Sequence, residues 1–461
     1  MAFRFVRCLT LAVLALAAQS FPSRAQAPDI RSPEVVVPAS MNIPAPEGLK
    51  AQFPQGFTPG LGFGLNCAQA QPDGAMVLHT LTGRGPTLAG PMVAVPGGLV
   101  PSSVFVLPGF APAIATMRLF GNKAEVVGML PLKDEDGTPL TGLPPAPVIT
   151  GGQAEAPLDL ALNRLANNPH GIDPQGVAYD FKRGVFWLVD GYRPALARVS
   201  PRDGRVSSML VPGDGLEDYL ATCRAGWGFS GVSISPTGKI YTIMRGVLSV
   251  GGKPAIFSRI VEFDPDTERV RQLPYPIDEE AFADPSQVST GEVVAVADKR
   301  LLVLEQGPGK DGRPRSLIYA VDLTQTSNIN RVFNDAGQPI EVLTDRAQWS
   351  KMKLNLARKT LVVDLHAAGF KDRYAESMTL LSDGLTLAVM SGHGFGLEAQ
   401  IAGYASDESG RPVLDAPRYQ LGQGGVLTYA GQPTKAVISF KPSRETPRLW
   451  VATLPKKVSD Y

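Results

Sequence analysis

Histidine and cysteine are scarce in this sequence, which has four histidines and three cysteines among its 461 residues. Neither residue type occurs in the C-x-x-C or H-E-x-x-H spacing of common zinc sites. The chain also lacks a G-x-S-x-G turn and a Walker-type loop. These absences argue against a zinc hydrolase, against a serine hydrolase with a nucleophile elbow and against a nucleotide-binding enzyme.

An excess of charge of one sign is also missing. The 44 Lys and Arg residues nearly balance the 43 Asp and Glu residues, so the formal net charge is +1. A nucleic-acid-binding protein usually carries a basic stripe or domain, and this balance argues against one. The ordinary hydrophobic content of 44% and the low charged content of 19% argue against a disordered chain.

Long hydrophobic runs are absent as well. The run at residues 8–18 has 11 residues, which is too short to cross about 30 Å of hydrocarbon. It follows Arg4 and Arg7 and precedes the small-x-small sequence Ala-Gln-Ala at 25–27. This order is typical of a cleaved signal peptide. We therefore predict a signal peptide at 1–27 and export to the periplasm or the cell exterior, with no membrane contact after cleavage.

Removal of the signal peptide leaves two cysteines, Cys67 and Cys223. An oxidising compartment permits a disulfide between them, and export favours that pairing. The alternative is a pair of buried free thiols that pack as small hydrophobic side chains.

Glycine and proline are abundant, with 48 and 41 residues. Both residue types mark turns, so the chain is expected to consist of many short elements rather than a helical bundle. Residues 28–57 are proline-rich and are expected to form an extended lead-in to one domain at 58–461. A weak helical pattern occurs only near 340–353.

Within that domain a β-hairpin pattern repeats, with two apolar strands joined by a turn rich in Pro, Asp and Gly. Clear copies lie at 176–190, 231–244, 292–305 and 376–390, and weaker ones at 62–80 and 436–453. Hairpins followed by outer strands predict an all-β fold, a β-propeller of six or seven blades. A tandem β-sandwich is the alternative. Insertions at 132–174, 326–350 and 392–422 are expected to be exposed loops that carry function.

Several stretches of these repeats, in the same order along the chain, resemble motifs of one known family. They are residues 134–144 (DEDGTPLTGLP), 170–178 (HGIDPQGVA), 186–194 (FWLVDGYRP), 228–238 (GFSGVSISPTG), 302–306 (LVLEQ) and 318–323 (IYAVDL). The family is the phytase-like one, described as "esterase-like activity of phytase". The resemblance extends over about 58–455 and implies a β-propeller hydrolase.

The chain departs from the family pattern at several acidic positions. Gln175 and Ser230 replace glutamates, while Gly191 and Gly83 replace the acids of two further motifs. The retained charged residues are Asp173, Asp190, Glu305, Glu376 and Arg84.

The retained acids occupy similar positions in successive repeats, and such positions cluster around the axis of a propeller. Hard cations such as Ca²⁺ prefer several carboxylate ligands. Asp173, Asp190, Glu305 and Glu376 are therefore predicted metal ligands, with Ca²⁺ as the candidate cofactor. In the alternative, each acid caps a turn of its own blade. The lost acids would leave a weaker ion site or none.

Three residues are candidates for catalysis. Glu376 is a retained acid, and His393 lies in a loop where a histidine could act as general base. Arg84 could hold an anionic group through its guanidinium fork, as could Arg193. The alternatives are a hydrogen-bonded loop histidine and arginines in inter-blade salt bridges.

The sequence is compatible with two functions. The first is an exported hydrolase of phosphoesters or other esters, assisted by a divalent cation. The second is a non-catalytic propeller that binds a ligand or a protein partner. In both cases the expected ligand is a small phosphoester or another anionic molecule, nucleic acid is excluded, and a closed propeller is expected to be a monomer.

Overall fold

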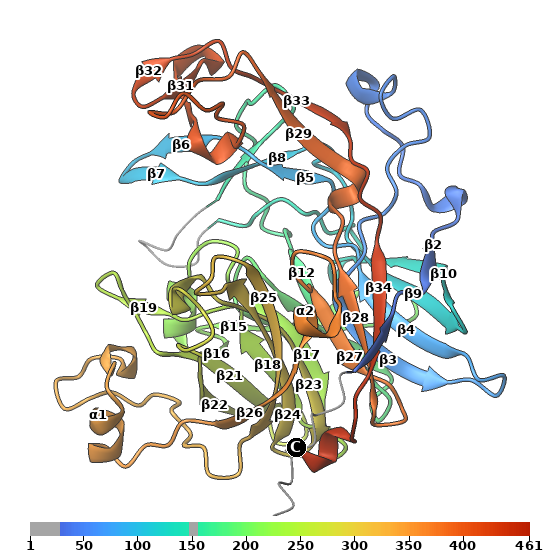
Figure 1. Cartoon of the computed structure of the whole chain (residues 1–461), viewed down its shortest axis with the longest axis vertical. Coiled ribbons are helices and arrows are strands. Elements are labelled where there is room, and N and C mark those ends of the chain that lie inside the picture. The colour runs from blue at the N-terminus through green and yellow to red at the C-terminus, as the bar shows by residue number, and fades with distance from the viewer. Residues whose placement is uncertain (1–27, 147–154) are drawn as a thin grey trace, which may run out of the picture.

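The computed structural model describes residues 28–146 and 155–461, and it is almost entirely β (Figure 1). The predicted signal peptide at 1–27 lies outside the described residues. The α-helices of the described ranges are short, α1 (Arg346–Lys351) and α2 (Leu365–Ala368), and α1 falls inside the predicted helical region. No helix in the described ranges has the length and apolar content to cross a bilayer.

Five sheets of four or five strands form the body of the described chain, and we number them as blades 1 to 5. Blade 1 contains β3 (Phe63–Ala70), β4 (Met76–Leu81), β9 (Ala113–Phe120), β10 (Lys123–Pro131) and β2 (Glu34–Val36). Blade 2 contains β12 (Pro174–Asp180), β13 (Val185–Asp190), β14 (Ala195–Val199), β15 (Val206–Pro212) and β16 (Gly215–Leu216). Blade 3 contains β17 (Phe229–Ile234), β18 (Ile240–Met244), β21 (Phe257–Asp264) and β22 (Arg269–Pro276). Blade 4 contains β23 (Ser289–Ala297), β24 (Arg300–Pro308), β25 (Pro314–Asp322) and β26 (Arg358–Asp364). Blade 5 contains β27 (Ser377–Leu380), β28 (Thr386–Ser391), β34 (Arg448–Thr453) and β1 (Asp29–Arg31).

Each blade contributes its innermost strand to a closed ring, and these strands are β3, β12, β17, β23 and β27. β3 contacts β12, β12 contacts β17, β17 contacts β23, β23 contacts β27, and β27 returns to β3. This arrangement confirms the predicted β-propeller. The described residues contain five blades, however, and not the six or seven predicted. The copy predicted at 436–453 is divided, because β33 (Val437–Pro442) pairs with β29 (Leu397–Ala402) outside the ring, whereas β34 belongs to blade 5.

Glycines allow the inner strands to approach one another. A Cβ atom on Gly64 would lie 2.7 Å from the Cα of Gly176, and one on Gly176 would lie 2.9 Å from the Cα of Gly231. Real Cβ atoms are not found this close to backbone atoms. The repeats at 176 and 231 therefore begin with glycine because a side chain there would collide with the backbone of the neighbouring inner strand.

Both faces of a blade are buried, which explains the apolar runs in the sequence. In blade 2, Val177 and Leu188 pack toward blade 1, while Ala178, Trp187 and Val189 pack toward blade 3. Strands buried on both faces are continuously hydrophobic rather than alternating.

The proline-rich segment is built into the domain. β1 pairs antiparallel with β34 and completes blade 5, and β2 pairs parallel with β10 in blade 1. Leu49, Phe53 and Phe57 then pack into a core shared with residues of a second layer. Residues 28–57, predicted as an extended lead-in, therefore pack against both the ring and the second layer.

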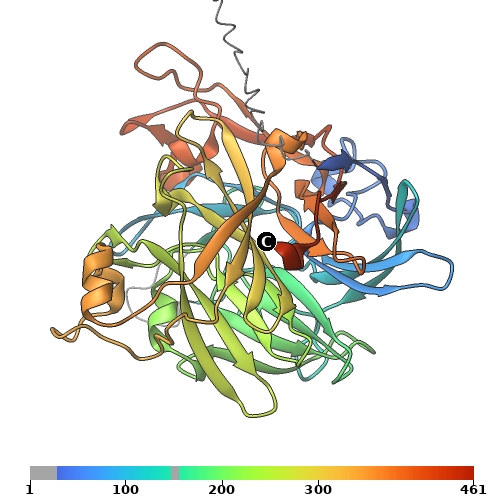
Figure 2. The ribbon, with the colours of Figure 1, turned by 60° about the horizontal axis from the view of Figure 1, so that its bottom comes forward.

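The second layer, which we call the cap, covers one end of the ring (Figure 1). It consists of three small sheets built from insertions in blades 1 and 5 and from the segment before blade 2. Its strands are β5 (Thr87–Ala89), β6 (Met92–Val95), β7 (Gly98–Val100), β8 (Ser102–Phe105), β11 (Ala156–Leu158), β29, β30 (Gln420–Leu421), β31 (Leu427–Tyr429), β32 (Gln432–Pro433) and β33. A further hairpin, β19 (Ser249–Val250) and β20 (Lys253–Pro254), extends from blade 3. Figure 2 shows the C-terminal residues at the opposite end of the ring.

The predicted disulfide is wrong, because Cys67 and Cys223 are both free. Cys67 lies in β3 of blade 1 and Cys223 follows η3 (Asp218–Thr222), so the two thiols belong to different blade cores. Burial raises the pKa of Cys67 to about 11 and that of Cys223 to about 12. Both thiols are therefore protonated at neutral pH and act as packing groups.

Candidate functional site

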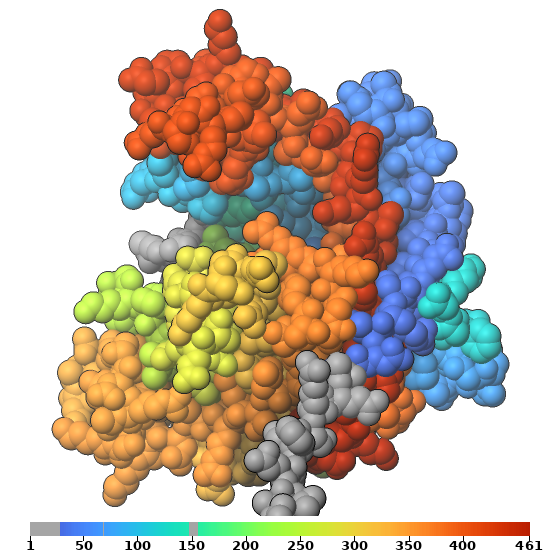
Figure 3. Space-filling view, in the orientation of Figure 1, coloured from blue at the N-terminus to red at the C-terminus, as the bar shows by residue number. Residues whose placement is uncertain are grey.

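The candidate site lies at the end of the ring that faces the cap. At this end the inner strand of each blade begins and the second strand ends. The loops that follow these second strands carry polar residues, which are Arg84 after β4, Tyr192 after β13, Arg245 after β18 and His393 after β28. Figure 3 shows the surface hollowed between the β6–β7 hairpin of the cap and the ring. The topology thus gathers polar loop residues from several blades under the cap.

Arg245 of blade 3 lies across the axis of the ring. Its guanidinium donates a hydrogen bond of 3.4 Å to the side-chain oxygen of Gln175 in blade 2. It also lies 4.0 Å from the carboxylate of Glu376, which precedes the inner strand of blade 5. Blades 3 and 5 are not neighbours in the ring, so only a side chain near the axis reaches both. About a quarter of each side chain, 25% for Arg245 and 28% for Glu376, is exposed.

A second arginine increases the positive charge beside Arg245. Arg224 stacks on the indole ring of Trp227, and the guanidinium of Arg245 lies 5.9 Å from the centre of the same ring. Burial and then the charge of Arg245 lower the pKa of Arg224 to about 10. Every Asp and Glu of the sequence lies in the described ranges, and none forms a salt bridge with Arg224. We call Arg245, Glu376, Gln175, Arg224 and Trp227 the axial site.

Asp173 and Asp190 lie close together beside the axial site. The backbone N–H groups of Asp173 and Tyr192 donate to Oδ1 of Asp190, at 3.0 and 2.9 Å. Oδ2 of Asp190 is buried without a hydrogen-bond partner in the described chain, and Nε of Arg193 lies 3.8 Å away. Burial raises the pKa of Asp173 against the opposing charges of Arg84 and Arg245. Burial also raises the pKa of Asp190, to about 7.

Replacement of Asp190 by asparagine should flatten the pH dependence of stability. The pKa of Asp190 rises from its ordinary 3.8 to about 7 in the folded protein, so the folded state binds a proton that the unfolded chain releases within this window. The wild-type protein should therefore lose up to about 1.4 kcal/mol of unfolding free energy per pH unit as the pH rises between these values. Asp190→Asn removes this contribution. Urea unfolding of both proteins at about pH 5 and pH 7 measures the difference.

The exposed Asp335→Asn variant is the control for this measurement, and its pH dependence should match that of the wild type. An equal difference in unfolding free energy between wild type and Asp190→Asn at the two pH values would show that Asp190 is ionised throughout.

The structure places Arg84, a predicted catalytic residue, in a network of hydrogen bonds between the ring and the cap. Its guanidinium forms a two-pronged ion pair with Glu155, at 2.6 and 3.2 Å. It also donates to the hydroxyl groups of Ser103 and Tyr192. Because Ser103 belongs to the cap and Tyr192 to blade 2, Arg84 ties the cap to the ring. Both terminal nitrogens of the guanidinium are bonded, as in the salt-bridge alternative, and a catalytic role of Arg84 stays a prediction.

Glu305 does not converge with the other predicted metal ligands. Its carboxylate accepts a hydrogen bond of 2.6 Å from the Tyr275 hydroxyl and pairs with the ammonium of Lys359. Burial raises the pKa of Glu305, and the charge of Lys359 opposes that shift. Glu305 therefore belongs to an interface between blades 3 and 4.

His393 lies at the start of the insertion that forms half of the cap, and its side chain is buried. Burial lowers its pKa to about 4, and its Nδ1 atom has no hydrogen-bond partner in the described chain. The imidazole is therefore neutral at pH 7 but is a weak base. Of the predicted catalytic residues, only Glu376 both reaches the axial site and is partly exposed.

The predicted calcium site does not fit these residues. Within the described ranges, no group of three or more His, Cys, Asp or Glu side chains is placed to hold a metal ion. Guanidinium groups accompany the acids instead: Arg193 is next to Asp190, and Arg245 is next to Glu376. A hard divalent cation would have to compete with these fixed positive charges.

Sequence reasoning missed three residues near the axis. Arg245 and Arg224 were not predicted, although Arg245 directly follows the second strand of a repeat and the predicted Arg84 lies in the turn after another such strand. Glu292 begins another repeat and lies on the axis itself, where it accepts backbone hydrogen bonds of 3.2 Å from Leu65 in blade 1 and Val232 in blade 3. Burial raises the pKa of Glu292 well above its ordinary value. Its side chain therefore links blade 4 to blades 1 and 3.

These features define a capped five-bladed β-propeller with a positively charged axial site. The phytase-like family, "esterase-like activity of phytase", matches residues 110–392, which is more than half of the chain. The chain belongs to this family, as the sequence motifs predicted.

Comparison with solved structures gives more distant similarities. The periplasmic gluconolactonase PpgL of Pseudomonas aeruginosa is 13% identical with a TM-score of 0.31, over 82% of this chain and 88% of that one. The α-L-arabinofuranosidase PaAbf62A of Podospora anserina is 9% identical with a TM-score of 0.34, over 93% and 98%. Hydrazine synthase of Kuenenia stuttgartiensis is 13% identical with a TM-score of 0.32, over 72% and 92%. No curated protein sequence matches the chain.

Proposed function

We propose that this protein is an exported hydrolase of small anionic esters, with phosphomonoesters as the first class to test, and that hydrolysis takes place at the axial site. The observation that carries the proposal is the position of Arg245, a partly exposed guanidinium over the axis whose one carboxylate partner lies at 4.0 Å. Membership of the phytase-like family supports ester hydrolysis as the reaction.

In this proposal the two arginines bind the substrate and Glu376 activates water. Arg245 and Arg224 hold the anionic group of the ester, since guanidinium forks match phosphate and carboxylate oxygens. Glu376 accepts a proton from water as the water oxygen bonds to the phosphorus or acyl carbon. The bond to the ester oxygen then breaks, and the departing oxygen takes up the proton that Glu376 accepted, which restores the carboxylate. The arginines also stabilise the negative charge that develops in the transition state.

Three further features belong to the proposal. The pattern at 1–27 supports export to the periplasm or exterior. The closed ring supports a monomer. Ca²⁺ has no assigned role, because the acids of the site do not form a ligand group.

A second candidate function is ligand binding without turnover. It is favoured by the replacement of family glutamates with Gln175 and Ser230. The Ser230 hydroxyl donates to the carbonyl oxygen of Thr290 and is buried, so it is a structural group rather than a nucleophile.

Hydrolysis of a chromogenic phosphomonoester and a chromogenic carboxyl ester by the mature protein tests the proposal, with EDTA or added Ca²⁺ in parallel. Turnover of at least one ester is expected, with a loss of about 100-fold or more in kcat for Glu376→Gln. The exposed Glu408→Gln variant is the control. No turnover of either ester in any condition would support the binding function instead. Turnover that survives unchanged in Glu376→Gln would remove the glutamate from the mechanism.

A further inference from the structure

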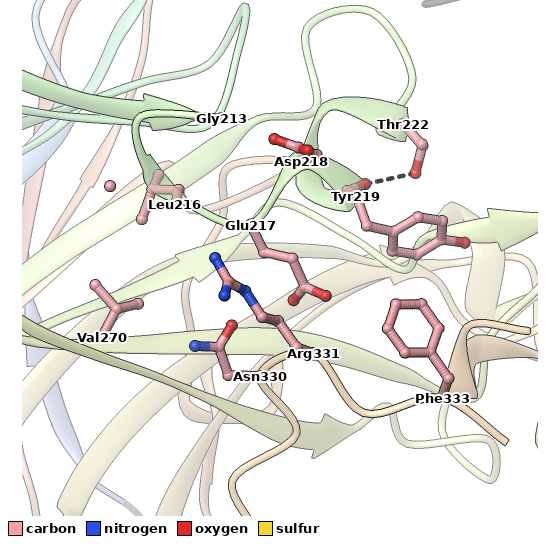
Figure 4. A pocket seen from close by; sticks show the side chains of 11 residues that line it. Gly213, Leu216, Glu217, Asp218, Tyr219, Thr222, Val270, Asn330, Arg331 and Phe333 are labelled. Carbon is pink, nitrogen blue, oxygen red and sulfur yellow. Dashed lines mark hydrogen bonds between the residues drawn. The ribbon is translucent and has the colours of Figure 1, made fainter. Parts of the chain in front are cut away.

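A cavity of about 730 Å³ opens at the outer strands of blades 2 and 3 and shares no residue with the axial site. One wall is the segment from Gly213 to Thr222, which includes η3 (Asp218–Thr222). The opposite wall is the insertion that follows β25, through Asn330, Arg331 and Phe333. Figure 4 shows the rings of Tyr219 and Phe333 near the Glu217 carboxylate, with the Arg331 guanidinium beside it.

Glu217 presents a fixed and incompletely bonded carboxylate to this cavity. Its side chain is only 9% exposed. Its Oε2 atom accepts hydrogen bonds from Arg259, at 2.8 Å, and from the Gln272 amide, at 2.7 Å. Its Oε1 atom accepts none from the described chain. Oε1 therefore stays in contact with solvent in the cavity and is free to accept a charge-assisted hydrogen bond from a donor on a ligand.

The charge behind the cavity wall is negative. Arg259 also bonds Glu341, at 2.7 Å, so one guanidinium serves two carboxylates. Asp218 adds another acid to the lining. A positively charged donor would therefore satisfy both the free oxygen of Glu217 and the excess charge.

Two aromatic rings and one arginine in the lining indicate which other chemical groups a ligand would carry. Tyr219 and Phe333 line the cavity, and Phe333 is 50% exposed. Aromatic faces attract organic cations. Arg331 lines the same cavity with a left-handed backbone (φ 57°), a conformation that is uncommon for residues other than glycine and that concentrates at functional sites. Its guanidinium favours a ligand that also carries an anionic group.

We propose that this cavity binds a small zwitterion with a primary ammonium and a carboxylate. The ammonium donates to Oε1 of Glu217 and lies against the rings of Tyr219 and Phe333, and the carboxylate pairs with Arg331. This binding site is separate from the proposed ester hydrolysis and does not depend on it.

Titration calorimetry of the mature protein with γ-aminobutyrate tests the proposal, with butylammonium and butyrate as half-ligands. γ-Aminobutyrate should bind more tightly than either half-ligand. Glu217→Gln should weaken its binding by about tenfold or more, and so should Phe333→Ala, which removes an exposed ring and leaves the cores intact. Arg331→Gln should weaken γ-aminobutyrate but not butylammonium. Glu408→Gln, an exposed glutamate of the cap, should change nothing.

Absence of binding heat at millimolar γ-aminobutyrate would overturn the proposal. Unchanged affinity in both Glu217→Gln and Phe333→Ala would overturn it as well, because the second variant does not alter the buried charge network. Binding of butylammonium as tight as that of γ-aminobutyrate would overturn the zwitterion and the role of Arg331.

Discussion

Replacement of Arg245 by glutamine should lower kcat/KM for an anionic ester by about 100-fold. The guanidinium of Arg245 lies over the axis of the ring, where it is 4.0 Å from Glu376 and bonds Gln175. The variant removes a positive charge that would act on both the bound ester and its transition state. Steady-state kinetics on the ester that the wild-type protein turns over fastest would measure the loss.

Two companion variants separate charge from geometry. Arg245→Lys keeps the charge but loses the planar fork, so a smaller loss of about tenfold is expected. Arg202→Gln removes an exposed arginine from a turn of blade 2 and should leave kcat/KM unchanged. If Arg245→Gln hydrolyses the ester as fast as wild type, the axial site is not the place of hydrolysis.

The Arg259→Met variant should lower the free energy of unfolding by about 3–5 kcal/mol. The Arg259 side chain is 2% exposed and pairs with Glu341, which is fully buried. Methionine fills similar space but leaves the Glu341 carboxylate in the core without a counter-charge. Oε2 of Glu341 already lacks a hydrogen-bond partner in the described chain, so no second donor there offsets the loss of the Arg259 guanidinium. Urea unfolding at neutral pH would measure the change.

The control for this variant lies on the neighbouring strand. Arg271 in β22 pairs with Glu262 at 3.2 Å, but its side chain is 33% exposed. Arg271→Met should therefore cost about 1 kcal/mol or less, because Glu262, although only 5% exposed, keeps the Tyr241 hydroxyl at 3.0 Å and the Lys239 ammonium at 3.9 Å. The double variant Arg259→Met with Glu341→Met should recover part of the lost stability. Equal losses for Arg259→Met and Arg271→Met would show that the Arg259 network is not an electrostatic support of the fold.

The sequence by itself determined the all-β propeller and much of the end where the site lies. The hairpin repeats predict blades because both faces of each blade are buried, as the apolar runs of β12 and β13 show. The repeat pattern also placed Asp173, Asp190 and Glu376 at the same end of the ring. These features are local, because a hairpin and its turn are encoded in about 15 consecutive residues.

Only the tertiary structure decided the number of blades, the partners of the charged residues and the state of the cysteines. The repeat at 436–453 is divided between the cap and blade 5, because β34 returns to β28 only after the long insertion that carries the cap strands. Glu305 pairs with Lys359, which reaches blade 4 after an insertion of more than 30 residues. Arg245 meets Glu376 because the ring closes. Each of these contacts joins residues far apart in the chain, and local pattern contains no information about which distant strand will lie beside another.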